Sequence, residues 1–303
     1  MKILKPYLAF LLTMPFGVSL ANGGYSVGYE SFAFDDNRSD ANGALGSAEA
    51  RKSPNYQVSA WMADALDEDF DYSLLGYYED HNPSDVVAGS TLDDSMASAA
   101  VLQTSIFKQT DNNTLVGVGL SYAIQAEKES VNSTTEEINF TIAALDLSMA
   151  KQVGKTTYLA TLGYYKNLSA DKDSGGSTQR HTDDTTYVAL AVDYEHNQQF
   201  DFGGSIASFD GDGKREGYSD EPGKEAIFYD LYTRYKMSDY QLRVGYINRD
   251  FDDKDDNEWL KGDGVYATLE VPFGAGSDKK ETMLVTQKPQ FWKHHGIASG
   301  PLE

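Results

Sequence analysis

The chain has 303 residues, with 47 acidic residues against 25 basic ones and a net charge of −22. Such an acidic surface repels nucleic acid, because nucleic-acid binding depends on neutralising phosphates with Lys and Arg. The chain contains no cysteine, so disulfides, thiolate-zinc sites and cysteine nucleophiles are excluded.

The first 21 residues have the organisation of an export signal. Two lysines precede an apolar stretch from Tyr7 to Leu20, and Ala21 supplies a small residue before a cut. The alternative is a transmembrane helix, but this stretch is short for a span and Pro15 interrupts it. We therefore expect residues 1–21 to be a signal peptide that is removed on export.

The mature chain shows runs of alternating apolarity, joined by connections that are short and long in turn. These runs predict twelve strands, at residues 24–35, 55–65, 70–79, 96–109, 114–126, 137–151, 155–168, 185–195, 199–209, 225–237, 240–251 and 263–273. Five connections are tight turns, and the six between them are expected to run to about a dozen residues or more. This rhythm is typical of an all-β fold, a closed antiparallel transmembrane up-and-down β-barrel of the outer membrane, with short turns in the periplasm.

The two-residue period within strands predicts which side of the wall faces lipid. Val118, Leu120 and Tyr122 lie on one face of the fifth strand, and Gly117 and Gly119 lie on the other. A barrel in lipid must be apolar on its outer side, so the first set is predicted to point outward. A soluble β-sandwich remains the alternative, because the period does not identify the solvent.

Two of the strands break this period. The breaks fall after Tyr29, with Phe32 and Phe34, and between Ile142 and Leu145. β-Bulges are expected to restore the alternation at both places.

The last strand carries a local motif, with Val265, Leu269, Val271 and Phe273 at alternating outward positions. It resembles the closing-strand signal of Gram-negative outer-membrane proteins, which implies recognition by the barrel-assembly machinery, with periplasmic chaperones during biogenesis. Residues 22–274 are thus predicted to form the barrel and residues 275–303 a periplasmic C-terminal tail. The tail could plug the lumen, bind a partner or be loose; a loose tail is the default expectation.

In strand number and size, the mature chain also resembles autotransporter translocators, outer-membrane phospholipases and small substrate-selective channels. No motif selects among them. An autotransporter translocator carries a large passenger and a helix through the pore, whereas few residues precede the first strand here. That resemblance implies a solitary barrel without cargo.

The inward faces predict a lumen with two different sides. Small residues such as Ser205, Ala207, Ala189 and Ala191 make one side thin. The opposite side is charged, and the predicted lumen or constriction residues are Asp201, Asp230, Arg234, Arg243, Arg249 and Glu270. Arginines facing acids either form a constriction that sorts solutes or a salt-bridged plug that fills the barrel.

The sequence therefore favours a small, porin-like diffusion channel for small hydrophilic solutes, in the outer membrane of a Gram-negative bacterium. The alternative is a structural or surface-interaction barrel with a plugged lumen, and an outer-membrane hydrolase is a remote third. Expected partners are outer-membrane lipid and lipopolysaccharide, together with small solutes.

We expect no enzyme, because none of the histidines is predicted to lie in a strand, where a barrel hydrolase would place its base. His81 and His181 fall in predicted outer loops, and His196 falls in a short turn. Neither a metal nor a cofactor is expected. The segment beginning at Asp210 imitates a calcium loop, but Lys214 stands where a ligand is needed.

Overall fold

The computed structural model describes residues 22–35, 51–81, 92–111, 113–131, 134–172, 181–214, 223–253, 258–273 and 279–286. These residues form twelve strands and one helix. They are β1 (Asn22–Asp35), β2 (Arg51–Ala65), β3 (Phe70–His81), β4 (Leu92–Asp111), β5 (Thr114–Val131), β6 (Thr134–Val153), β7 (Thr156–Lys172), β8 (His181–Glu195), β9 (Phe200–Lys214), β10 (Lys224–Lys236), β11 (Gln241–Asp253), β12 (Glu258–Phe273) and α2 (Lys279–Thr286). The predicted signal peptide, residues 1–21, lies outside the described residues.

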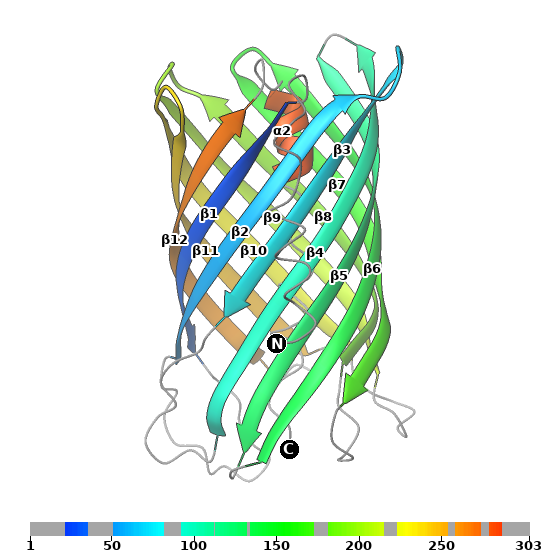
Figure 1. Cartoon of the computed structure of the whole chain (residues 1–303), viewed down its shortest axis with the longest axis vertical. Coiled ribbons are helices and arrows are strands. Elements are labelled where there is room, and N and C mark those ends of the chain that lie inside the picture. The colour runs from blue at the N-terminus through cyan, green and yellow to red at the C-terminus, as the bar shows by residue number, and fades with distance from the viewer. Residues whose placement is uncertain are drawn as a thin grey trace.

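The strands form a closed barrel in which each strand pairs with its neighbours in the chain (Figure 1). β1 closes the ring by pairing antiparallel with β12, from Gly23 opposite Phe273 to Asp35 opposite Lys261. The sheet consequently has no free edge, which confirms the predicted twelve-stranded antiparallel barrel and removes the sandwich alternative. Among the described residues, no helix is long and apolar enough to cross a membrane.

The side chains alternate across the wall as predicted. Leu120 and Leu162 are 56% and 57% exposed on the outside, whereas Ser121 is 2% exposed and faces the lumen. Hydrophobic side chains thus cover the outside of a closed sheet, which is the arrangement that suits a barrel in lipid.

The strands are longer than predicted at one rim only. At the short-turn rim, predicted and observed ends agree within two residues, whereas at the other rim strands run up to five residues further. The expected long loop after β5 is wrong, because β5 reaches Val131, β6 begins at Thr134, and residues 132–133 alone lie between them. Hydrogen-bonded pairing continues here through polar sequence, where the apolar alternation that revealed the strands is missing.

The predicted bulge near Ile142 is not in β6. β6 pairs with β5 without a register shift, and Ile142 points into the lumen with no exposed surface. The shift lies instead in the β6–β7 pairing, where Leu168 of β7 is the extra residue. β1 also pairs in continuous register with both its neighbours, so the bulge expected there is absent as well.

α2 follows β12 and lies at the short-turn end of the barrel (Figure 1). It contacts β2, β3, β5, β6 and β7, and its side chains pack against inward-facing residues of these strands. α2 is therefore inside the lumen. Residues 279–286 pack against the inner wall, so the expectation of a loose tail is wrong for them.

Candidate lumen site

Arg234 of β10 is the centre of a buried ion-pair cluster. Its Nη1 lies 3.0 Å from Oδ2 of Asp193 and 3.3 Å from Oδ2 of Asp201, and its Nε lies 3.8 Å from Oε2 of Glu270. Nζ of Lys236 lies 2.9 Å from Oδ1 of Asp201. Three strands besides β10 thus contribute acids to one cationic side chain, and the cluster ties β8, β9 and β12 to β10.

Arg243 of β11 forms a second cluster beside the first. Its Nη2 lies 2.6 Å from Oδ2 of Asp230, and its guanidinium lies 3.8 Å from the ring centre of Tyr232 and 5.5 Å from that of Tyr266. The Tyr266 hydroxyl donates to Asp230 over 2.7 Å. Two rings and one carboxylate therefore hold this cation in place.

Glycines on neighbouring strands explain how these tyrosines lie against the wall. Tyr232 stands opposite Gly203, and Tyr266 stands opposite Gly245. A Cβ on Gly203 would come within 2.3 Å of the Tyr232 ring, and one on Gly245 within 2.4 Å of the Tyr266 ring. The missing side chains leave the space that each ring occupies, as aromatic residues do beside glycine in sheets. The Gly163–Tyr187 pair of β7 and β8 repeats this arrangement.

The space over Gly203 also links the two clusters. Gly203 pairs with Asp193 on its other side, so Asp193, Gly203 and Tyr232 form one row across β8, β9 and β10. The Tyr232 hydroxyl donates to Oδ2 of Asp193 over 2.7 Å, the oxygen that also receives a hydrogen bond from Arg234. Tyr232 therefore joins the Arg234 cluster to the Arg243 cluster.

Arg249 takes part in a separate network closer to the long-loop rim. Its Nη2 lies 2.6 Å from Oε1 of Glu30 on β1, and both side chains are buried. On the neighbouring β2 and β3, the Tyr77 hydroxyl lies 2.6 Å from Oε2 of Glu79 and 2.9 Å from Oε1 of Gln57, so its one proton has two possible acceptors. The six predicted lumen residues thus all face inward, but Arg249 is not part of the cluster that unites the other five.

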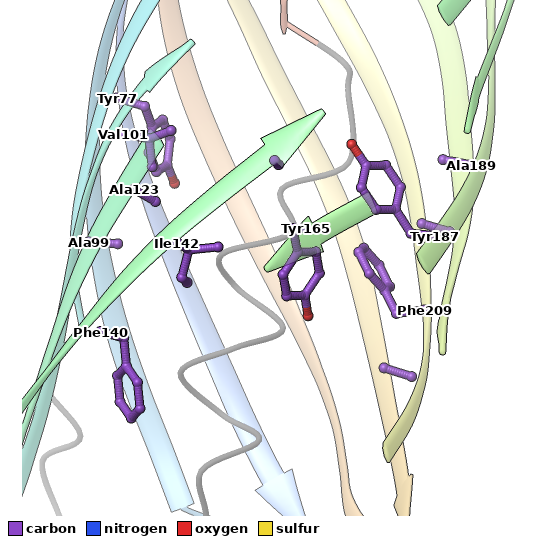
Figure 2. Packing of buried hydrophobic residues seen from close by; sticks show 13 residues of the cluster. Tyr77, Ala99, Val101, Ala123, Phe140, Ile142, Tyr165, Tyr187, Ala189 and Phe209 are labelled. Carbon is purple, nitrogen blue, oxygen red and sulfur yellow. The ribbon is translucent and has the colours of Figure 1, made fainter. Parts of the chain in front are cut away.

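An aromatic layer also faces the lumen, and sequence reasoning missed it. Figure 2 shows Phe140, Tyr165, Tyr187 and Phe209 pointing to the inside of the barrel, with Tyr187 and Phe209 next to each other. The Tyr187 ring lies 5.4 Å from that of Phe209, and Phe209 lies 5.0 Å from Phe228. The signal was present in the two-residue period, which places these rings on the inward side of their strands.

The barrel encloses a chamber of about 420 Å³ between these features. Its lining includes Asp230, Arg234 and Arg243 on the charged side, and the small residues Ala189 and Ala191 on the other. The predicted thin wall is confirmed on β8. Gly117 of β5 also faces inward but leaves no open space, because a Cβ there would meet Cβ of Phe107 at 2.9 Å.

The residues predicted to signal assembly point outward along β12. Val265, Leu269, Val271 and Phe273 are all exposed on the barrel surface. The Phe273 ring lies 5.3 Å from that of Tyr25 on β1, so it covers the seam where the barrel closes. Their role in assembly remains a prediction.

Two of the histidines are placed differently from the prediction. His81 is the last residue of β3 and His181 is the first of β8, so both belong to strands rather than loops. His196 does lie in a short turn, where its ring packs between Tyr194 and Phe202.

The beginning of the segment that imitates a calcium loop, residues 210–214, is strand, since β9 extends to Lys214; the rest of the segment lies outside the described residues. Within the described parts of the chain, no group of three or more His, Asp or Glu side chains is arranged to hold a metal ion.

Comparison with known proteins finds no matching family model and no matching curated protein. Among solved structures, the translocator domain of the autotransporter NalP from Neisseria meningitidis aligns with a TM-score of 0.54 at 8% identity, over 89% of this chain and 95% of that one. The β domain of the Bordetella autotransporter BrkA aligns with a TM-score of 0.51 at 6% identity, over 83% and 100% of the two chains. At these identities the likeness shows the fold alone: the chain has the barrel fold of autotransporter translocator domains.

Proposed function

We propose that this chain is an outer-membrane barrel of a Gram-negative bacterium that serves as a small, porin-like diffusion channel for small hydrophilic solutes. The apolar outer surface supports a position in lipid, with lipopolysaccharide as a neighbour. Export by a signal peptide, periplasmic chaperones and the barrel-assembly machinery belong to the same proposal. The proposal involves no catalytic step.

The chamber is the observation that carries this proposal. Side chains can fill the interior of a barrel of about eight strands, whereas this wider barrel leaves about 420 Å³ open inside it. Charged groups of Asp230, Arg234 and Arg243 reach this space, together with the polar side chains of Gln241 and Thr268. Such a lining offers hydrogen bonds and charge to a passing solute, which suits hydrophilic molecules better than apolar ones.

Conductance measurements test the proposal. The purified full-length chain, reconstituted in a planar lipid bilayer, is expected to give discrete conductance steps. The same preparation after heat denaturation is the control and is expected to give none. A folded barrel that remains silent under all conditions, including after removal of residues 275–303, would contradict the channel.

A structural or surface-interaction barrel is the second candidate, and the buried ion pairs favour it. Arg234 lies among three acids and Arg249 pairs with Glu30, so these cations are already neutralised by the protein. Pairs of this kind also fasten strands across the lumen. This candidate predicts no conductance steps for the truncated chain as well as for the full one.

A further inference from the structure

We propose that α2 is a detachable plug that narrows the chamber at the short-turn mouth of the barrel. The consequence for solute passage rests on the proposed channel function, whereas the narrowing itself does not. α2 follows the closing strand β12 in the chain and lies inside the lumen. The occupant of the mouth is thus a segment of the same chain.

The mouth of the lumen is built to receive an apolar segment. Consecutive residues Met283, Leu284 and Val285 of α2 are each only 2% exposed. They pack in one cluster with inward-facing side chains from seven strands, namely Trp61, Ala63, Leu75, Phe107, Leu115, Ala150, Leu159 and Ala191. Without α2, leucine and phenylalanine side chains would line an open end of the lumen and face water, which is unfavourable. The complementary apolar residues of α2 therefore match the wall that they cover.

The position of α2 makes it one boundary of the chamber. Val285 and Thr286 are among the residues that line the cavity, together with Trp61, Leu75 and Leu159 of the same mouth. On the side of β2, β3, β5, β6 and β7, α2 lies between the chamber and the short-turn rim, whereas Lys236 and Gln241 line the cavity on the opposite side. The charged clusters of Arg234 and Arg243 lie on the other side of the cavity, and their ion-pair partners Asp193 and Asp230 are on strands rather than on α2.

The helix can leave without opening the wall. All twelve strands are hydrogen-bonded in a closed ring that does not include α2. α2 has eight residues, and its buried side chains are Met283, Leu284, Val285 and Lys280. The gain from burying the apolar side chains is opposed by the entropic cost of ordering the helix, so releasing α2 costs far less than opening the wall.

A single thiol can report on the plug, because the chain has no cysteine of its own. Ala191→Cys places the reporter on a residue that both lines the chamber and packs in the α2 cluster. Labelling by a small charged maleimide should be at least ten-fold faster when Leu284→Asp is added, because a carboxylate at this buried position expels α2. Truncation after Gly274 should accelerate labelling to the same extent. Ser238→Asp adds the same charge at an exposed turn of the same rim and should leave the rate unchanged.

Conductance of the same variants separates the two proposals. Faster labelling with larger or more frequent conductance steps supports both the plug and the channel. Faster labelling without conductance in any variant retains the plug and overturns the channel. Equal labelling rates in the full and truncated chains, with each shown to be folded by heat-modifiable electrophoretic migration, overturn the plug. If both chains conduct, equal conductance in the two overturns it as well.

Discussion

Single residues in the wall differ in what they can accept, because one side faces lipid and the other faces the lumen. Leu120 is exposed on the outer surface. Gly119, which directly precedes it in the chain, points inward opposite Asp146 of β6. Leu120→Arg is expected to cost about 2–4 kcal/mol near the middle of the bilayer. Gly119→Arg should be tolerated, since its charge can meet Asp146. Refolding of both variants into lipid vesicles under a urea gradient measures this difference, and a larger loss for Gly119→Arg would reverse the assignment of faces.

Substitution of Gly203 is expected to lower the stability of the barrel far more than the partial exposure of this residue indicates. In Gly203→Val, the new side chain would collide with the Tyr232 ring and separate its hydroxyl from Asp193. Asp193 would keep Arg234 but lose the tyrosine, so a loss of about 1–3 kcal/mol in unfolding free energy is expected for the hydrogen bond, with the steric collision adding to it.

Tyr232→Phe is the matched control for that substitution. It removes the hydroxyl and retains the ring over Gly203, so it should show only the hydrogen-bond part of the loss. Chemical unfolding of both variants in vesicles separates the two contributions. If both variants unfold like the parent, the row of Asp193, Gly203 and Tyr232 is not a stabilising unit.

At the scale of elements, the closing strand and α2 should separate in a truncation series. Truncation after Gly274 removes α2 but leaves β12 paired to β1 through Phe273, so a heat-modifiable barrel should still assemble. Truncation before Val271 removes the residues at the end of the seam, including the Phe273 ring that covers Tyr25, and assembly should fail. Electrophoresis with and without heating measures both outcomes. Loss of assembly on removing residues 275–303 alone would make α2 an essential part of the fold.

The sequence was most informative about elements where the solvent differs on the two sides of the chain. Within the apolar band the alternation of Val118, Leu120 and Tyr122 was sufficient to assign both strand and face. Beyond that band both faces of a strand meet water, so the continuation of β5 to Val131 left no apolar pattern. The position of α2 could not be predicted either, because its three apolar residues pack against side chains from seven different strands, which only the folded barrel brings together.

The sequence predicted which charged residues face the lumen, but it predicted only in part which of them contact one another. Alternation placed Arg234, Arg243 and Arg249 inside correctly, because inward and outward positions follow from the period alone. Their partners depend on the register between strands, which the sequence of one strand does not contain. This is why Asp193 was not among the predicted constriction residues, although it lies 3.0 Å from Arg234. Ile142 shows a different source of error. It is apolar and was therefore assigned to the outer face, so its inward position was interpreted as a break in the period.

At the scale of the whole molecule, charge sets the expected selectivity of the proposed channel. The chain carries 47 acidic residues against 25 basic ones, so cations should be concentrated near its surface at low ionic strength. The screening length falls from about 10 Å at 0.1 M salt to about 3 Å at 1 M salt. Reversal potentials across a salt gradient should therefore show a modest cation preference in dilute salt that fades as the salt concentration rises.

The arginines inside the lumen should reduce this preference for cations, because their positive charges repel cations in the lumen. Neutralising Arg234, Arg243 and Arg249 together is expected to raise conductance and sharpen cation selectivity, but it would leave several buried acids without their cations and threaten folding. Arg243→Gln is the more informative variant, because an amide can still donate to Asp230 while the positive charge beside Tyr232 and Tyr266 is lost. Its reversal potential should shift toward that of an ideal cation channel. Anion selectivity in the parent, or an unchanged reversal potential in a folded Arg243→Gln barrel, would remove Arg243 from the conducting path.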